Sequence, residues 1–80
     1  MNMKKMLSAV AWVGAALLLA AFVANSNGYL STNHPYYHIM NLLGAAGIAA
    51  QAWNRRAYPA AALNIVWAIV ALIGLIRILG

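Results

Sequence analysis

MLSAVAWVGAALLLAAFVA, residues 6–24, is an unbroken run without a charged side chain and with a single hydroxyl, at Ser8. A helix needs about 20 apolar residues to cross the roughly 30 Å hydrocarbon core of a bilayer. The run is longer than the apolar core of about 7–15 residues that signal peptides carry. It therefore predicts a membrane-spanning helix that serves as an uncleaved anchor.

The whole chain has the same character as this run. Its 80 residues are 66% hydrophobic and 6% charged, with five Lys or Arg and no Asp or Glu. A soluble domain of this size needs a charged exterior. Most of the surface is therefore expected to face lipid, and the length allows a single transmembrane domain, residues 1–80.

Two further segments complete an all-α prediction of three transmembrane helices packed as a small bundle. The second helix is expected at residues 35–54, with Pro35 in its first turn and Asn33 or His34 as its cap. The third is expected at residues 59–79, opened by Pro59 in the same way. The first connection, NSNGYLSTNH, is polar and uncharged, whereas only RRAY separates the second helix from the third.

The cations set the expected orientation. Two lysines precede the first helix and two arginines lie in the second connection, so three spans place both pairs on one side. Because cytoplasmic loops carry an excess of Lys and Arg, the N-terminus is expected in the cytoplasm and the C-terminus outside. The expected membrane-interface anchors are Lys4, Lys5, Trp53, Arg55, Arg56, Tyr58 and Arg77.

Three amides lie within the predicted spans: Asn41, Gln51 and Asn64. Each would be costly against lipid, so each is expected to face another helix or a wet cavity. By depth, Gln51 can meet Asn64, and Asn41 can meet Arg77. Hydrogen bonds between helices are the favoured interpretation, and a polar pathway is the alternative.

Small residues predict close helix packing. Gly44 and Gly47 lie in a Gly/Ala-rich run of the second helix, and a loose echo occurs at Gly14 in the first. Trp67 is expected to fill space left by small neighbours and to direct its N–H at an amide or carbonyl. Small faces exceed what three helices need, so identical copies or other membrane subunits are expected as partners. The expected packing positions are Asn41, Gly44, Gly47, Gln51, Asn64, Trp67 and Ala68.

The sequence gives little support for enzyme activity, metal binding or nucleic-acid binding. Without cysteine or carboxylate side chains, the chain lacks a thiolate nucleophile, an Asp or Glu acid–base group and ordinary Ca²⁺ or Mg²⁺ ligands. His34 and His38 could begin a metal site, but nothing nearby completes one, and capping roles are favoured. No enzyme activity and no cofactor are expected, and the scattered cations form no basic face for nucleic acid.

Two stretches, YHIMNLLGAAG at residues 37–47 and PAAALNIVW at residues 59–67, resemble the signature segments of a family of small, uncharacterised bacterial integral membrane proteins. The pattern is Asn-x-x-Gly-Ala in one helix and Leu-Asn-x-x-Trp in the next, with a proline between them. WVGA at residues 12–15 fits as well, so the similarity covers most of residues 12–75. The resemblance implies a compact three-helix module of the bacterial inner membrane and supplies no activity.

The leading hypothesis is a non-enzymatic three-span module whose function is packing. It would act as a structural or accessory subunit of a larger membrane complex, or as a homo-oligomeric module in the lipid bilayer. The alternative is a minimal oligomeric transporter or channel whose polar pathway is lined by Asn41, Asn64 and Gln51.

Overall fold

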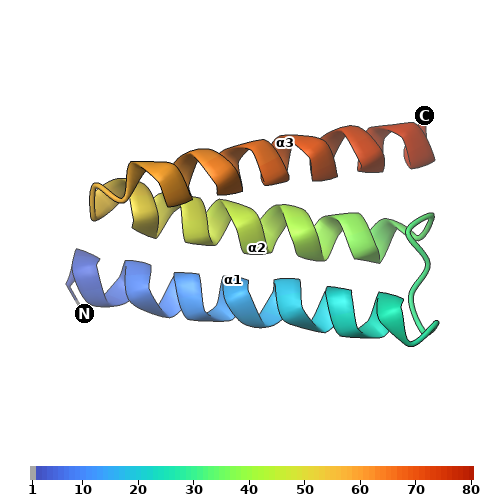
Figure 1. The fold of residues 1–80 in the computed structure, drawn as a ribbon, viewed down its shortest axis with the longest axis horizontal. Coiled ribbons are helices and arrows are strands. Elements are labelled where there is room, and N and C mark those ends of the chain that lie inside the picture. The colour runs from blue at the N-terminus through green and yellow to red at the C-terminus, as the bar shows by residue number, and fades with distance from the viewer. Residues whose placement is uncertain (1) are drawn as a thin grey trace.

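The computed structural model describes residues 2–80 and contains three α-helices: α1 (Met3–Ser26), α2 (Pro35–Asn54) and α3 (Tyr58–Leu79) (Figure 1). The predicted all-α fold with three helices is confirmed. Helix α1 extends beyond residues 6–24 at both ends. At its start, Asn2 Oδ1 accepts a hydrogen bond from the Lys5 N–H at 2.8 Å, which caps the helix and brings Lys4 and Lys5 into its first turn.

Helix α2 begins where the proline predicts. Pro35 occupies the first turn, where its missing N–H costs nothing. His34 is the cap, because its Nδ1 accepts a hydrogen bond from the Tyr36 N–H at 3.1 Å. Asn33, the other expected cap, instead donates its backbone N–H to Ser31 Oγ within the connection.

The chain leaves α1 and α2 by the same backbone motif. Gly28 (φ 80°) and Arg56 (φ 58°) both adopt the left-handed conformation just after the helix. The next N–H, of Tyr29 or Ala57, then donates to a carbonyl five residues back at 2.8 Å. This arrangement, the Schellman motif, satisfies carbonyls that a helix end would otherwise leave unpaired. Glycine adopts this conformation freely, whereas arginine does so at a cost of about 1–2 kcal/mol.

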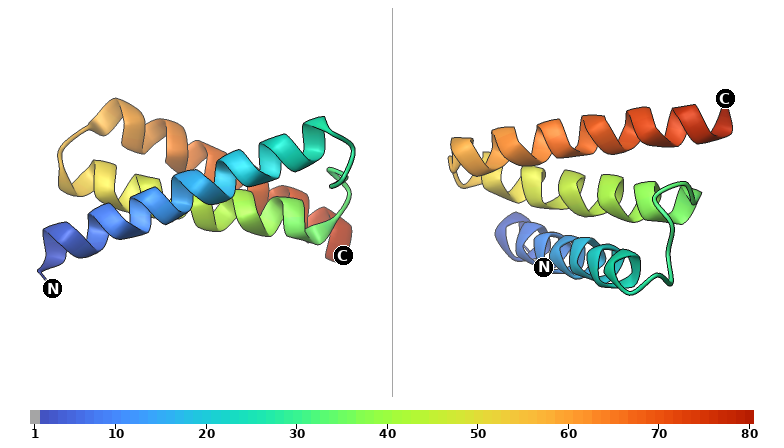
Figure 2. Two further views of the ribbon diagram at one scale, coloured as in Figure 1. Left: turned by 90° about the horizontal axis from the view of Figure 1, so that it is seen from below. Right: turned by 45° about the vertical axis from the view of Figure 1, so that its right-hand side comes forward.

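The three helices lie in a row with α2 in the middle (Figure 1). Among the described residues, no Cα atom of α1 comes within 8 Å of one in α3. Helix α1 also runs obliquely across α2, as the two views of Figure 2 show. Within residues 2–80, α1 and α3 therefore each pack on α2 and not on each other.

Two helices, α1 and α3, are long and apolar enough to cross a membrane, and α2, the shortest at 20 residues, is not among them. The position of α2 explains its composition. Six of its residues are buried, compared with three in α1 and two in α3. A helix covered on two sides can keep a polar side chain such as Asn41 away from lipid.

Candidate functional site: the two faces of α2 and its open side

Helices α1 and α2 meet backbone to backbone. A methyl group added at Gly14 would lie 2.5 Å from the carbonyl oxygen of Gly44, and one added at Gly44 would lie 2.6 Å from the carbonyl oxygen of Gly14. One turn away, a methyl group at Gly47 would lie 3.1 Å from the Val10 carbonyl oxygen. Only glycine permits this approach, which is the close packing that small residues allow in membrane helices.

The sequence suggested only a loose repeat of the Gly-Ala pair at Gly14, whereas the structure places Gly14 directly against Gly44 of α2. The repeated Gly-Ala pair in the first and second helices was the signal that could have located this interface. Val10, Gly14 and Leu18 follow one another at four-residue spacing on α1, which places them on one face. That face lies against Gly44 and Gly47 of α2.

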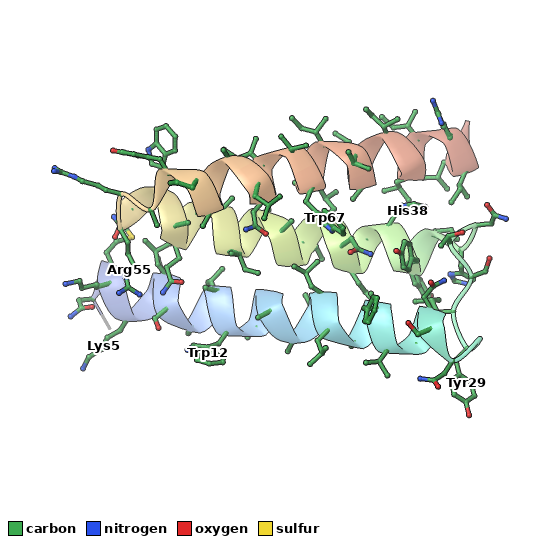
Figure 3. All side chains as sticks on the ribbon, in the orientation of Figure 1. Lys5, Trp12, Tyr29, His38, Arg55 and Trp67 are labelled. Atoms are coloured by element: carbon green, nitrogen blue, oxygen red, sulfur yellow. The ribbon has the colours of Figure 1, made fainter. Side chains whose placement is uncertain are left out.

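Helices α2 and α3 meet through side chains. The indole N–H of Trp67 donates to Asn41 Oδ1 at 3.0 Å, and Asn41 Nδ2 donates to the Tyr37 carbonyl at 2.7 Å (Figure 3). Asn41 is 7% exposed, so its amide is both buried and satisfied. The expected contact between Asn41 and Arg77 is not formed, because Trp67 takes the amide oxygen and Arg77 is exposed.

His38 fills the end of the same interface that lies nearest the first connection. A methyl group at Gly74 would lie 2.5 Å from His38 Cε1, so the imidazole rests on the glycine of α3. His38 Nε2 also lies 2.7 Å from the Thr32 carbonyl oxygen, which ties the first connection to the bundle. Within residues 2–80, no three potential ligands gather to hold a metal ion. His34 caps a helix and His38 packs between two helices.

Gln51 and Asn64 do not meet. Asn64 Nδ2 donates to the Ala60 carbonyl of its own helix at 2.9 Å. Gln51 instead lies on the α1 side of α2, in clefts shared with Ser8 and Arg55. The expectation from depth was wrong because it ignored which face of α2 each neighbour covers. Ala68, beside Trp67, is half-buried on α3.

A cavity opens over α2 where α1 and α3 fail to meet. We call it the central groove; its volume is about 370 Å³. Helix α1 supplies one wall, α2 the floor and α3 the other wall through Trp67, which is 50% exposed. Its lining residues are Ala15, Leu18, Leu19, Phe22, Tyr37, Asn41, Ile48 and Trp67.

A second cavity, the basic cleft, lies at the end of the molecule where α1 starts and α2 finishes. Its volume is about 340 Å³. Lys5 and Arg55 lie at this end in Figure 3. Nearby, the rings of Trp53 and Tyr58 stack edge to face across the second connection, 5.3 Å between centroids. The residues lining the basic cleft are Asn2, Lys4, Lys5, Leu7, Ser8, Gln51, Asn54 and Arg55.

A comparison with protein families matches residues 7–80, which is nearly the whole chain, to one family model. The chain therefore belongs to that family, an uncharacterised family of bacterial type. No curated protein and no solved structure matches the chain. The matched range includes all of α2 and α3, and α1 from residue 7 onward.

Proposed function

We propose that this protein is a non-enzymatic packing module that crosses a bacterial inner membrane three times. The exposed surfaces of α1 and α3 support a membrane location. Only 17% of the most apolar stretch of α1 is buried, and only 6% of that of α3. A core helix of a soluble protein would bury such a stretch, whereas here large apolar side chains such as Trp12 (74% exposed) face outward.

The proposed orientation follows from the end that carries the basic cleft. Lys4, Lys5 and Arg55 line that cleft, and Arg56 adjoins it in the connection. The positive-inside bias places this end in the cytoplasm. The first connection and the C-terminus then lie outside, where Arg77 on the last turn of α3 reaches the headgroups.

The central groove is the feature that supports a role in packing against another subunit. Its floor includes the Asn41 amide, and its wall includes an indole whose N–H is already committed to that amide. Both polar groups are therefore satisfied, but the groove leaves half of the Trp67 side chain uncovered among mainly apolar neighbours, and such an apolar recess is a place where another helix can pack. A transmembrane helix of another subunit would cover the open side of α2 and give α1 and α3 a shared neighbour. The chain would then act as an accessory subunit of a larger membrane complex.

The two signature segments of the resemblance support this function. They contain Asn41, Gly44 and Trp67, which form the contacts of α2 with both of its neighbours. These three residues of the chain serve helix packing. The lack of cysteine and of carboxylate side chains supports a non-enzymatic role.

Site-specific crosslinking tests the groove. The chain has no cysteine, so single-cysteine variants can each carry a photoactivatable crosslinker. Phe22→Cys, at a residue 66% exposed, places it on the groove wall, and Leu63→Cys, at a residue 64% exposed on α3, is the matched control outside the groove. In native membranes we expect a discrete adduct from position 22 that is absent from position 63 and is lost when Leu19→Trp fills the groove.

The adduct mass identifies the occupant. A mass of two 8.5 kDa chains would show a homo-oligomer, and a larger discrete mass would show a partner subunit. Equal labelling of lipid alone from both positions would overturn the packing function.

The alternative function is a minimal oligomeric transporter or channel. One observation favours it: Asn41 lines the central groove, and Gln51 lines the adjoining cavity that shares Ala15 and Ile48 with the groove. Asn64, the third amide of the expected pathway, bonds its own helix. Reconstituted vesicles that pass small solutes, and lose this flux in Asn41→Leu and Gln51→Leu variants, would favour transport over packing.

A further inference from the structure

The basic cleft gathers positive charge that nothing in the chain neutralises. Three of its lining residues are cations: Lys4 and Lys5 in the first turn of α1, and Arg55 at the cap position just after α2. The sequence has no Asp or Glu, so no side chain can serve as their counterion. The chain's C-terminus lies at the opposite end of the molecule (Figure 1). An anion that pairs with this cleft must therefore belong to another molecule.

Hydrogen-bond donors surround the same space. Ser8, Gln51 and Asn54 also line it, and none of their side chains bonds another residue within the described part of the chain. The carbonyls at the end of α2, by contrast, accept hydrogen bonds from the backbone of the connection, as the Ala52 carbonyl does from the Ala57 N–H. The cleft thus offers cations and unused donors, which is the set that an oxyanion such as phosphate recognises.

The cleft is continuous with an apolar furrow. A neighbouring cavity of about 320 Å³ shares Ser8, Gln51 and Arg55 with the cleft. It continues between α1 and α2 along Ala11, Trp12, Ala15 and Ile48, and we call this part the furrow. A ligand that fills both is charged at one end and apolar along its length.

We propose that the basic cleft binds the phosphate of an anionic glycerophospholipid and that the furrow holds one of its acyl chains. A free phosphate would leave the furrow unused. A zwitterionic headgroup would bring its own amine against three cations, so an anionic headgroup is preferred. The inference rests on the proposed membrane location but not on the partner helix, which would lie in the central groove.

Native mass spectrometry of the purified chain in detergent tests the site. The probes are phosphatidylglycerol, phosphatidylcholine with the same acyl chains, and inorganic phosphate. We expect one phosphatidylglycerol to be retained in preference to phosphatidylcholine. Arg55→Gln should lower its affinity about fivefold, the usual effect of one cation beside an anionic headgroup.

Arg56→Gln is the matched control, because it removes the adjacent charge from a residue that does not line the cleft. It should change the affinity by less than twofold, as should Arg77→Gln on α3. Ala15→Phe should lower retention of the lipid without changing charge, since it fills the furrow. Circular dichroism checks that each variant keeps its helices.

Three results would each overturn the inference. Equal retention of the two lipids would show that no anion is selected. Equal losses in Arg55→Gln and Arg56→Gln would show attraction to the surface as a whole. Displacement of the lipid by inorganic phosphate at matched concentration would assign the cleft to a soluble anion. None of these results bears on crosslinking from position 22, which lines the central groove and not the furrow.

Discussion

The face of α2 that meets α1 is made of backbone, whereas the face that meets α3 is made of side chains. At the first interface the backbones of Gly14 and Gly44 leave no room for a methyl group between them, and within residues 2–80 no side-chain hydrogen bond joins α1 to α2. At the second interface an indole, an amide and an imidazole occupy the space. The comparison shows two ways of holding helices where the hydrophobic effect between them is weak: close van der Waals approach and interhelical hydrogen bonding.

The two faces also differ in how they can respond to change. A clash between backbones can be relieved only by moving a whole helix. A clash with a side chain can be relieved by a rotamer change or by truncating that side chain. Substitutions at the two faces should therefore differ in their cost to stability. Each cost is measured as the change in the free energy of unfolding in mixed micelles.

Gly14→Ala should have the largest effect. Its new methyl group would lie 2.5 Å from the Gly44 carbonyl oxygen, so α1 must move away from α2. We expect a loss of about 3 kcal/mol, at the upper end of overpacking costs. Ala16→Val, at an exposed position two residues along, is the control and should change the stability little. A Gly14→Ala protein as stable as the parent would refute the backbone contact.

Gly74→Ala should cost less, about 1–2 kcal/mol, because the new methyl group meets the His38 ring rather than backbone. The ring can turn, although it then loses its contact with the Thr32 carbonyl. The double variant Gly74→Ala/His38→Ala should recover part of the loss. If the double variant recovers no stability, the new methyl group at Gly74 clashes with something other than His38. If Leu18→Ala restores the stability of Gly14→Ala to a similar extent, the two faces do not differ in how they relieve a clash.

The hydrogen bond between Trp67 and Asn41 should contribute about 1 kcal/mol, within the range of interhelical bonds in membranes. A double-mutant cycle with Trp67→Phe and Asn41→Ala measures it. Trp12→Phe on the exposed face of α1 is the control and should not couple to Asn41→Ala. A coupling energy near zero would mean that the second interface, too, depends on packing alone.

The connections should give the smallest effects, with opposite signs. Arg56→Gly should stabilise the protein by about 1 kcal/mol, because it removes a side chain from the left-handed conformation. Gly28→Ala should destabilise it by a similar amount at the equivalent place after α1. Thermal unfolding of both variants checks this pair. If Arg56→Gly destabilises the protein, the arginine must make a contact that outweighs its backbone strain.

The helices themselves were predictable from local signals. The apolar runs, the two prolines and the polar connections fix where helices can form, because each acts on its own stretch of backbone. The helix that begins at Pro35 needed no tertiary information. Helix α1 begins at Met3, before the apolar run that starts at residue 6, because Asn2 caps it.

The pairing of polar residues was less predictable. Depth in the membrane, estimated from helix length, placed Asn41 beside Arg77 and Gln51 beside Asn64. Depth does not reveal rotation about the helix axis, and a rotation of α2 decides which neighbour each amide faces. Asn41 therefore accepts a hydrogen bond from Trp67, one of the expected packing residues, and Gln51 lines the basic cleft.

Composition and periodicity alone determined that the chain forms three helices, that its cations lie at helix ends, and that its acid–base chemistry is limited. These properties depend on each residue's own chemistry and on its near neighbours in sequence. Only the tertiary structure decided that α2 separates α1 from α3 and that Gly14 rests on Gly44. It also decided that Lys4, Lys5 and Arg55 share one cleft. Such contacts join residues far apart along the chain, and the order of helices in space follows from how small and large faces fit together.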